Sequence, residues 1–158
     1  MPKAKPAELS QNDRLILKAM QENCRLTTTQ LAEEANMSAS TCWRRIQAME
    51  ADKVISGYVA EIDAERVGLG FSAVAMVKMT RHSNDAVENF VQKVQKRPEI
   101  MQCFAITGEG DFMLRVVAED MADYRNFLNT FLFKLEGVDN VNTAVVMETI
   151  KDGSKLPL

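Results

Sequence analysis

The stretch TTTQLAEEANMSASTCWRRIQAME at residues 27–50 decides how the first part of this chain folds. Thr27 followed three residues later by Gln30 is a capping-box pattern, which begins a helix. The short run at residues 36–38 ends that helix, and Ser38 is a good N-cap for a second one. The apolar residues are spaced to give each helix one buried face: Leu31, Ala32 and Ala35 in the first, and Cys42, Ile46 and Met49 in the second. Two helices joined by so short a turn predict a helix-turn-helix.

A third helix is predicted just upstream of this pair, because Ser10 and Asp13 form another capping-box pattern. Apolar residues follow at helical spacing: Leu15, Ile16, Ala19 and Met20. We therefore expect residues 9–54 to form a winged-type helix-turn-helix domain, preceded by a disordered lead-in at residues 1–8. The lead-in has lysines but no apolar stretch behind them, so we do not expect a secretory signal.

The periodicity changes from helical to alternating after Lys53. Residues 55–62, with the sequence ISGYVAEI, alternate in a way that predicts a β-strand. Such a strand would have unpaired edges if it stood alone. The Gly-Leu-Gly run at residues 68–70 predicts a flexible joint, so we assign residues 55–70 to a connecting strand and a hinge.

Residues 71–158 contain an internal structural repeat of strand, helix and strand. Strands are predicted at residues 71–80, 100–107, 111–118 and 141–150. The first intervening helix starts at Ser83 or Asn84, and the second is capped by Asp120. The order βαββαβ is that of a ferredoxin-like domain, in which helices cover one face of the sheet and leave the other open. The sequence therefore predicts an α+β fold of two domains.

The composition of the 158 residues is that of a globular protein, with 46% hydrophobic and 26% charged residues. No apolar run approaches the roughly 18 residues that cross a membrane, so we expect no membrane association. The three cysteines, Cys24, Cys42 and Cys103, are odd in number and lack C-x-x-C spacing. We expect each to be a small core residue of a protein that resides in the reducing cytoplasm.

The net charge of −3 is unusual for a protein that binds DNA. Residues 1–63 carry 8 lysines and arginines against 9 aspartates and glutamates. Groove reading depends on where charge lies locally rather than on the total. An acidic DNA-binding protein would need its few cations on one face, and it would gain from dimerising because that doubles the phosphate contacts.

The second helix of the predicted pair has a polar face opposite its buried stripe. Ser40, Arg44 and Gln47 lie on that face. Arginine can bridge O6 and N7 of guanine, glutamine can pair with adenine, and hydroxyls can bind phosphate or base edges. For Arg45, nearer the core, we expect a phosphate contact or a salt bridge, and for Trp43 a packing role. The alternative for the whole face is ordinary solvation. The candidate DNA contacts are Ser38, Ser40, Thr41, Arg44, Arg45 and Gln47.

A second candidate site is the run Gly-Glu-Gly-Asp at residues 108–111. A hairpin turn alone would explain its glycines, and no phosphate-loop pattern follows it. In the strand before it we expect large residues such as Phe104 to face the helices, and the small Ala105 and Thr107 to line the open side. A free α-amino acid needs an anion for its ammonium group and N–H donors for its carboxylate. Asp111 can supply the first, and the turn backbone can supply the second.

Taken in order, these segments resemble the leucine-responsive regulatory protein/asparagine-operon regulator (Lrp/AsnC) family over roughly residues 8–158. The stretches that agree are at residues 9–17, 37–46, 55–58 and 107–112. This chain has Ala39 and Thr41 where the family often has prolines, and Gly110 where it usually has an aromatic residue. The resemblance implies a transcription regulator that binds double-stranded DNA and a small amino acid, with no other cofactor.

The resemblance also implies where the effector binds and how the chains assemble. The effector site would lie near the hairpin, at an interface between dimers, with Met121 as an apolar wall. Its residues would be Ala105, Thr107, Gly108, Glu109, Gly110, Asp111 and Met121. The strand at residues 55–62 would pair with its copy in a dimer, and dimers would assemble into an octamer. The open sheet face, with Ala73, Ala75 and Met101, would pack against a partner, since a monomer would expose too much apolar surface.

Enzymatic activity finds little support in the sequence. His82 is the single histidine, so we expect neither a His-based triad nor a multi-His metal site, and no paired carboxylates stand out. Three hypotheses stay open: a ligand-responsive transcription regulator, an architectural DNA-binding protein without an effector, and a ferredoxin-like enzyme with an incidental DNA-binding module. The lone histidine and the lack of cofactor signatures count against the third.

Overall fold

The structure, a computed structural model, describes three stretches of the chain: residues 7–80, 84–153 and 155–158. Three features considered in the sequence lie outside them: residues 1–6 of the lead-in, His82 and Ser83. The described residues form two compact units. The first contains the residues up to Glu61 together with Lys151–Leu158, and the second contains Ile62–Ile150. The segment Lys151–Leu158 thus groups with the N-terminal unit, although the sequence assigned it to the second domain.

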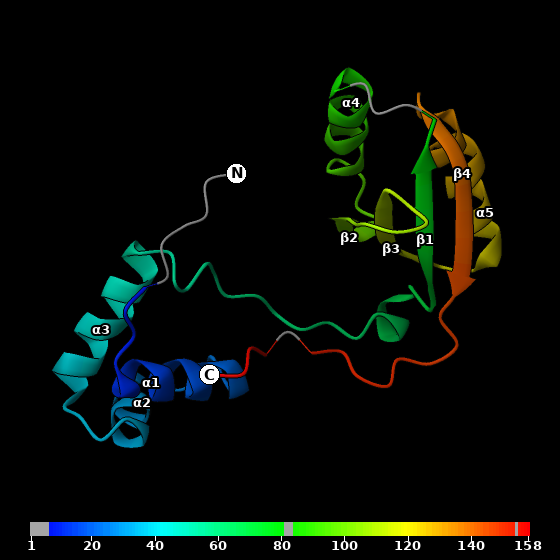
Figure 1. The fold of residues 1–158 in the computed structure, drawn as a ribbon. Coiled ribbons are helices and arrows are strands. Elements are labelled where there is room, and N and C mark those ends of the chain that lie inside the picture. The colour runs from blue at the N-terminus through cyan, green and yellow to red at the C-terminus, as the bar shows by residue number, and fades with distance from the viewer. Residues whose placement is uncertain (1–6, 81–83, 154) are drawn as a thin grey trace. The chain divides into compact units, whose positions relative to one another are not determined.

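The first unit is built from three helices: α1 (Gln11–Glu22), α2 (Thr28–Glu34) and α3 (Ala39–Ala51) (Figure 1). Both predicted capping boxes are present, one at the start of α1 and one at the start of α2. The predicted apolar stripes meet in one core, whose buried members are Ile16, Leu17, Leu31, Ala32, Ala35, Cys42, Ile46 and Met49. The three-helix arrangement is therefore confirmed.

The turn between α2 and α3 is short and well defined. Asn36 has a left-handed backbone conformation with φ of 51°, which asparagine tolerates better than most residues. The N–H of Met37 then donates to the carbonyl of Ala32 at 2.9 Å. Ser38 caps α3, because its side chain accepts a hydrogen bond from the N–H of Thr41. This is the tight turn that the sequence predicted.

The predicted strand at residues 55–62 is not a strand in the structure, and the described part of the chain before residue 71 contains none. The exposed fractions of Tyr58, Val59 and Ile62 are 52%, 88% and 68%. A strand needs a neighbour for its N–H and C=O groups, and none of the four described strands pairs with this segment. The alternating pattern alone therefore does not make a strand within one chain. Pairing with a copy stays a prediction.

The second unit is the expected βαββαβ domain. Its elements are β1 (Phe71–Met79), α4 (Asn84–Val94), β2 (Ile100–Ala105), β3 (Phe112–Ala118), α5 (Met121–Thr130) and β4 (Val138–Val145), with 3₁₀ turns at Glu65–Val67 and Leu132–Lys134. The sheet order is β2-β3-β1-β4, and all neighbouring strands are antiparallel. Figure 1 shows β1 and β4 side by side in this sheet. The ferredoxin-like arrangement is confirmed.

The last strand lies earlier in the chain than predicted, at Val138–Val145 rather than at residues 141–150. Gly137, with φ of 84°, closes the preceding turn, so the strand begins at the next residue. At the other end, the N–H of Val146 donates to the carbonyl of Ser72, next to the first residue of β1. The strand itself ends at Val145, which pairs with Ala73 of β1.

Helices α4 and α5 cover one face of this sheet and bury it. Ala73, Ala75 and Val77 of β1 are fully buried, in one cluster with Phe90 of α4 and Phe127 of α5. The prediction that Ala73 and Ala75 lie on the open face is therefore wrong. Small side chains in the central strand leave room for the aromatic rings of the covering helices. The size of a side chain alone therefore does not predict which face of the sheet it occupies.

The two faces of β2 are also the reverse of the prediction. Ala105 pairs with Phe112, a core residue, and so shares the helix-covered face. Phe104 pairs with Met113 and lies on the open face, where it is 45% exposed. The strand register is irregular at the start of β2, around Met101. Such a bulge shifts the alternation of side chains by one residue, and the sequence gives no sign of it.

Candidate DNA-contacting helix and ligand pocket

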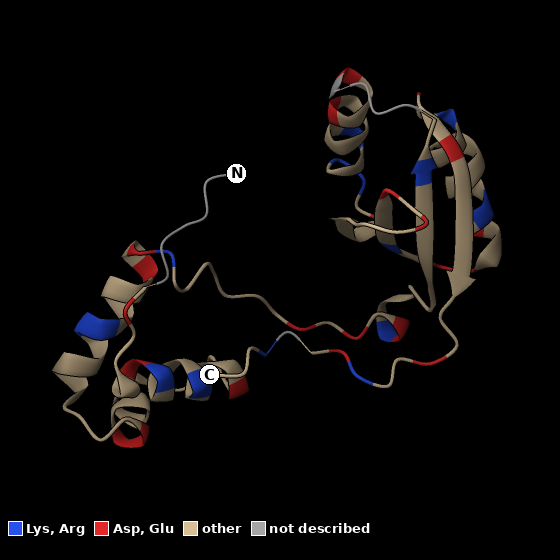
Figure 2. Ribbon diagram, viewed as in Figure 1, with Lys and Arg blue, Asp and Glu red and all other residues tan. Residues whose placement is uncertain are grey.

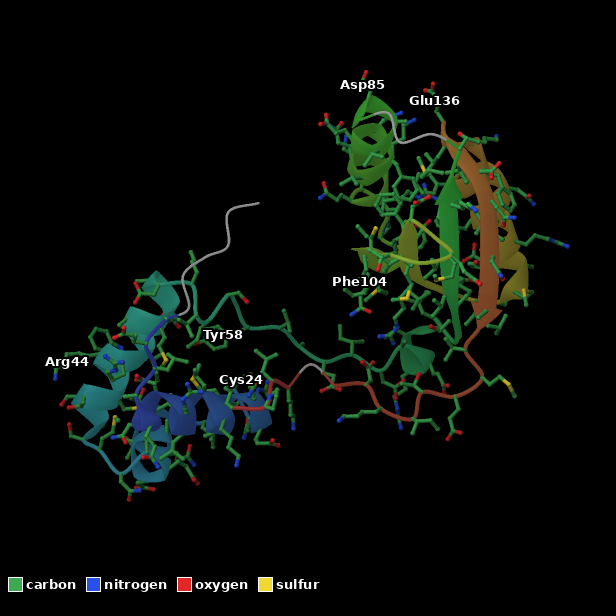
Figure 3. All side chains as sticks on the ribbon, viewed as in Figure 1. Cys24, Arg44, Tyr58, Asp85, Phe104 and Glu136 are labelled. Atoms are coloured by element: carbon green, nitrogen blue, oxygen red, sulfur yellow. The ribbon has the colours of Figure 1, made fainter. Side chains whose placement is uncertain are left out.

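Helix α3 presents a polar surface around Arg44. The predicted core face of α3 is buried, so Arg44, on the opposite side, is exposed and points away from the other helices (Figure 3). Three hydroxyls lie together at the start of the helix. The Oγ of Ser38 is 2.8 Å from Oγ1 of Thr41 and 3.2 Å from Oγ of Ser40. An arginine one turn from a cluster of hydroxyls has the chemistry to bind base edges and phosphates in a groove.

Arg45 holds α3 to α1. Its Nε donates to Oδ1 of Asp13 at 2.7 Å, and its Nη2 donates to Oδ2 of the same carboxylate. The side chain of Asp13 is fully buried, whereas that of Arg45 is 42% exposed. Asp13 also accepts hydrogen bonds from the N–H and the hydroxyl of Ser10, at 2.9 and 2.7 Å. Of the two alternatives predicted for Arg45, the structure contains the salt bridge.

The surroundings of Asp13 favour its charged form. The hydrogen bonds from Arg45, helped by those from Ser10, outweigh the opposing effect of burial and lower the pKa of Asp13 from 3.8 to about 2. The carboxylate is therefore ionised at neutral pH. It ties the first helix of the unit to the middle of α3 from within the core.

Two other side chains of α3 lie on its exposed flank. Nε2 of Gln47 donates to Oε2 of Glu50 at 2.8 Å, and Oε1 of Glu50 accepts from the hydroxyl of Tyr58 at 2.7 Å. Trp43 was expected to pack against a helix, but it is 56% exposed and lies outside the buried cluster of the unit. The structure thus adds Trp43, beside Arg44, to the candidate contacts. The sequence feature that could have indicated this role is the place of Trp43 next to Arg44 on the helix.

The three helices of the first unit carry acidic as well as basic residues. Figure 2 marks both acidic and basic residues along α1 and α3, and Glu33 and Glu34 add two acidic residues on α2. Together these helices hold four basic and five acidic residues, so they have no excess of cations with which to bind phosphates.

The β2–β3 hairpin is fastened to the end of β1. The N–H of Ile106 donates to the carbonyl of Asp111 at 3.0 Å, and the N–H of Asp111 donates to the carbonyl of Val77 at 2.9 Å. Oδ2 of Asp111 accepts from the N–H of Met79 at 2.7 Å. Gly110 is buried, and a Cβ there would lie 3.4 Å from the carbonyl oxygen of Val77. The acidic strand start therefore has a structural role in addition to any role in binding.

The turn of this hairpin exposes its backbone. Gly108 has φ of 126°, a conformation that other residues rarely adopt, and Thr107 and Glu109 are exposed on either side of it. Gly108 is exposed as well, whereas Gly110 is buried and the Asp111 carboxylate already accepts a backbone hydrogen bond.

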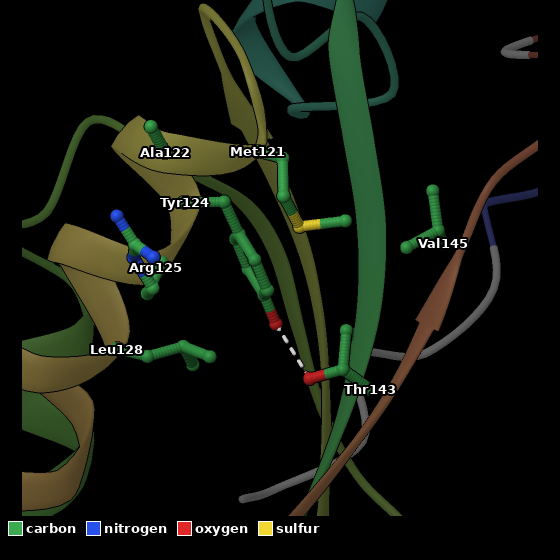
Figure 4. Close-up of a pocket in the computed structure, with 7 residues that line it drawn as sticks. All are labelled: Met121, Ala122, Tyr124, Arg125, Leu128, Thr143 and Val145. Atoms are coloured by element: carbon green, nitrogen blue, oxygen red, sulfur yellow. Dashed lines mark hydrogen bonds between the residues drawn. The ribbon is translucent and has the colours of Figure 1, made fainter.

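Met121 lines a pocket between α5 and β4 with a volume of about 540 Å³ (Figure 4). The lining residues are Met121, Ala122, Tyr124, Arg125, Leu128, Thr143 and Val145. The hydroxyl of Tyr124, a buried residue, is 2.8 Å from Oγ1 of Thr143. Arg125 is the one charged side chain in this lining. The pocket is thus apolar, with a single cation available for an acidic group.

The pocket and the hairpin are separated by the length of β3. The hairpin precedes Phe112, the first residue of the seven-residue strand, and Met121 follows its last residue, Ala118. Seven residues of strand span about 23 Å at roughly 3.3 Å per residue. The structure therefore does not bring Met121 together with Gly108, Gly110 and Asp111 within one chain.

The three cysteines differ in exposure. All are free; Cys42 is buried, as predicted, but Cys24 and Cys103 are exposed, so the prediction of a core role for these two is wrong. No group of three or more His, Cys, Asp or Glu residues in the described stretches could hold a metal ion. None of the helices among the described residues is both long and apolar enough to span a membrane.

Comparison with known proteins identifies both units. Residues 9–56 match the family described as winged helix-turn-helix DNA-binding, and residues 72–156 match the Lrp/AsnC ligand binding domain. The chain is 33% identical over 150 residues to the DNA-binding transcriptional activator DecR of Escherichia coli (strain K12), covering 95% of this chain and 99% of that protein. It is 33% identical over 152 residues to the Bkd operon transcriptional regulator of Pseudomonas aeruginosa, covering 96% and 99%.

A solved structure matches the whole fold. It is the crystal structure of a transcriptional regulator from Neisseria meningitidis in complex with L-Met, with a TM-score of 0.91, 36% identity and coverage of 95% of this chain and 97% of that chain. An AsnC family transcriptional regulator from Agrobacterium tumefaciens matches with a TM-score of 0.90 and 34% identity, over 94% and 97% of the two chains. The chain therefore belongs to the Lrp/AsnC family of transcription regulators, with a helix-turn-helix DNA-binding domain followed by the family's ligand-binding domain.

Proposed function

We propose that this regulator responds to a small amino acid that binds where two dimers meet, and that the bound amino acid changes its oligomeric state or its DNA binding. The observation that carries this is the separation of the candidate site along β3. A ligand that touches both the hairpin and Met121 needs them from different copies of the chain. Binding would then favour one assembly over another.

The effector would be an amino acid with a small or medium, apolar or weakly polar side chain. The related regulator from Neisseria meningitidis was solved with L-Met, which is of this kind. The turn N–H groups around Gly108 would bind its carboxylate, and Asp111 or Glu109 its ammonium group. Thr107 would border the site. Ala105 lies on the helix-covered face, so it would contribute only to a ligand that lies on that side.

On DNA, α3 would enter the major groove and Arg44 would read a base. Ser38, Ser40 and Thr41 would bind phosphate or base edges at the start of the helix. Gln47 would reach the next base along, and this requires it to leave Glu50. Arg45 would act mainly by holding α3 in place through Asp13.

The assembled form would be a dimer, and further an octamer, of a cytoplasmic protein without enzymatic activity. Three features support assembly. The segment at residues 55–62 has exposed apolar side chains and no partner strand among the described residues. Phe104 is exposed on the open sheet face, and Met101, at the bulge in β2, is exposed as well. The helices of a single DNA-binding unit carry acidic as well as basic residues, which favours two units acting together.

A screen of thermal midpoints against the twenty proteinogenic amino acids tests this function, because a ligand that binds only the folded state raises the midpoint. We expect one or a few amino acids to do so, and the best of them to change the mass measured by light scattering or the affinity for a selected DNA duplex. If no amino acid shifts the midpoint, the protein is an architectural DNA-binding protein instead.

A further inference from the structure

Lys155 and Leu156 contact the C-terminal end of α1. Nε2 of Gln21 donates to the carbonyl of Leu156 at 3.2 Å, and the N–H of Leu156 donates to Oε1 of Gln21 at 2.6 Å. Nζ of Lys155 donates to Oε2 of Glu22 at 2.6 Å. Two successive residues of α1 thus hold two successive residues that lie more than 130 positions later in the chain.

The contact with Gln21 recognises backbone rather than a side chain. A glutamine amide offers both donors and an acceptor, and here one of each is used by the same residue, Leu156. Such a reciprocal pair fixes which residue of an extended segment lies against the helix. It does not depend on the identity of the side chain at that position.

The ion pair between Lys155 and Glu22 has an electrostatic reason. The C-terminal end of a helix carries partial negative charge, which disfavours an acidic residue there and favours a cation. Glu22 is the last residue of α1, and the last turn of that helix has no basic residue of its own. Lys155 supplies the cation that this helix end lacks, so the end of α1 is complementary to the segment in charge as well as in hydrogen bonding.

We propose that the end of α1, at Gln21 and Glu22, is a docking surface for the segment Lys151–Leu158, and that this segment acts as a strap on the DNA-binding unit. The chain passes from one unit to the other after Glu61 and again after Ile150. With the segment docked, the DNA-binding unit is attached to the ligand-binding unit at two places. With the segment released, it is attached at one.

The number of attachments governs how two copies engage DNA. A unit on one flexible connection samples many orientations, which lowers the effective concentration of the second unit at its half-site once the first is bound. A second attachment reduces the number of orientations that the DNA-binding unit samples. This inference rests on the proposed function, because it describes how a change in the ligand-binding unit is passed to α3.

Hydrogen exchange of the full-length protein tests the docking directly. We expect the amide of Leu156 to exchange about two- to tenfold faster in Gln21→Ala, the ratio expected for losing one or two hydrogen bonds. Gln92→Ala, the same change at an exposed position of α4, is the matched control and should leave this amide unchanged. Glu22→Lys and Lys155→Glu should each speed exchange, and the double variant should restore protection. Equal exchange in wild type and Gln21→Ala would overturn the docking.

Binding to DNA tests the strap. The probe is a duplex with two inverted half-sites, selected from random sequence with the wild-type protein, beside the same duplex with one half-site scrambled. Gln21→Ala should bind the first duplex several-fold more weakly and the second as wild type does. Equal losses on both duplexes, no loss on either, or a changed oligomer mass would overturn the strap. Failure of wild type to select any duplex would refute the proposed function, while the exchange result would still decide the docking.

Discussion

Replacing Asp13 by asparagine should destabilise the DNA-binding unit by about 2 kcal/mol at neutral pH. The substitution keeps the size of the side chain and removes its charge. The native environment lowers the pKa of Asp13 from 3.8 to about 2, and a tenfold change in an acid dissociation constant corresponds to roughly 1.4 kcal/mol. Loss of a fully buried pair costs about 3–5 kcal/mol. Arg45 is 42% exposed and can turn toward water, so the smaller value applies.

The dependence on pH follows from the direction in which folding moves this pKa. A carboxyl group whose pKa is lowered by folding stabilises the native state above its unfolded pKa, near 3.8, and loses that contribution as the pH falls toward its folded pKa of about 2. Wild type should therefore lose about 2 kcal/mol of stability between about pH 5 and pH 2 through this group. Asp13→Asn should lack that part of the acid dependence.

Urea unfolding followed by tryptophan fluorescence measures this locally, because the single tryptophan, Trp43, lies in α3. Glu33→Gln, at an exposed position of α2, is the matched control and should change stability by less than about 0.5 kcal/mol. Two results would contradict this prediction. One is that Asp13→Asn unfolds at the same urea concentration as Glu33→Gln, and the other is that Asp13→Asn and Glu33→Gln lose stability equally toward pH 2.

Three further predictions concern function. Arg44→Ala should abolish preference for the selected duplex at a cost of about 1–3 kcal/mol per half-site with the fold intact, measured by gel shift at fixed salt; unchanged affinity would contradict it. Light scattering at micromolar concentration should give at least a dimer mass, in keeping with the unpaired segment at residues 55–62, and a monomer mass would exclude the proposed assembly. Asp111→Ala should remove the amino-acid response measured by calorimetry and keep DNA binding. Because Asp111 also accepts from the N–H of Met79, the uncharged Asp111→Asn serves as the second variant, and tight binding by both would place the site elsewhere.

The first unit could be predicted from sequence because its signals are local. A cap such as Ser10 with Asp13 involves residues three positions apart, and the buried stripe of α3 follows from helical spacing alone. The salt-bridge partner of Arg45 could not be predicted from local signals. Asp13 is recognisable as a capping residue, but its second role depends on how α1 packs against α3.

The faces of the sheet could not be predicted because they depend on non-local pairing. A bulge near Met101 reverses the alternation of β2 and moves Phe104 to the open face. The alanines of β1 lie under the helices, although their small size suggested an open surface. The segment at residues 55–62 alternates like a strand, yet a strand also requires a partner, and the described strands of one chain do not provide it.

The candidate effector site shows the same limit. Its turn was recognisable from the two glycines, and Gly108 has the left-handed backbone that favours glycine. The hydrogen bond from the N–H of Met79 to Asp111 joins residues 32 positions apart, so no local sequence pattern predicts it. The distance between the hairpin and Met121 is set by β3, which lies between them in the fold.

Mixing two defective variants tests the shared effector site most directly. Asp111→Ala alters the hairpin and Met121→Asp alters the pocket, so neither variant alone should bind the amino acid that gives the largest thermal shift for wild type. If each site takes its hairpin from one copy and Met121 from another, randomly reassembled equal mixtures should regain about one quarter of the wild-type sites. Calorimetry counts the amino-acid binding sites, and we expect recovery of this one quarter. No recovery, with assembly intact, would contradict a site shared between copies.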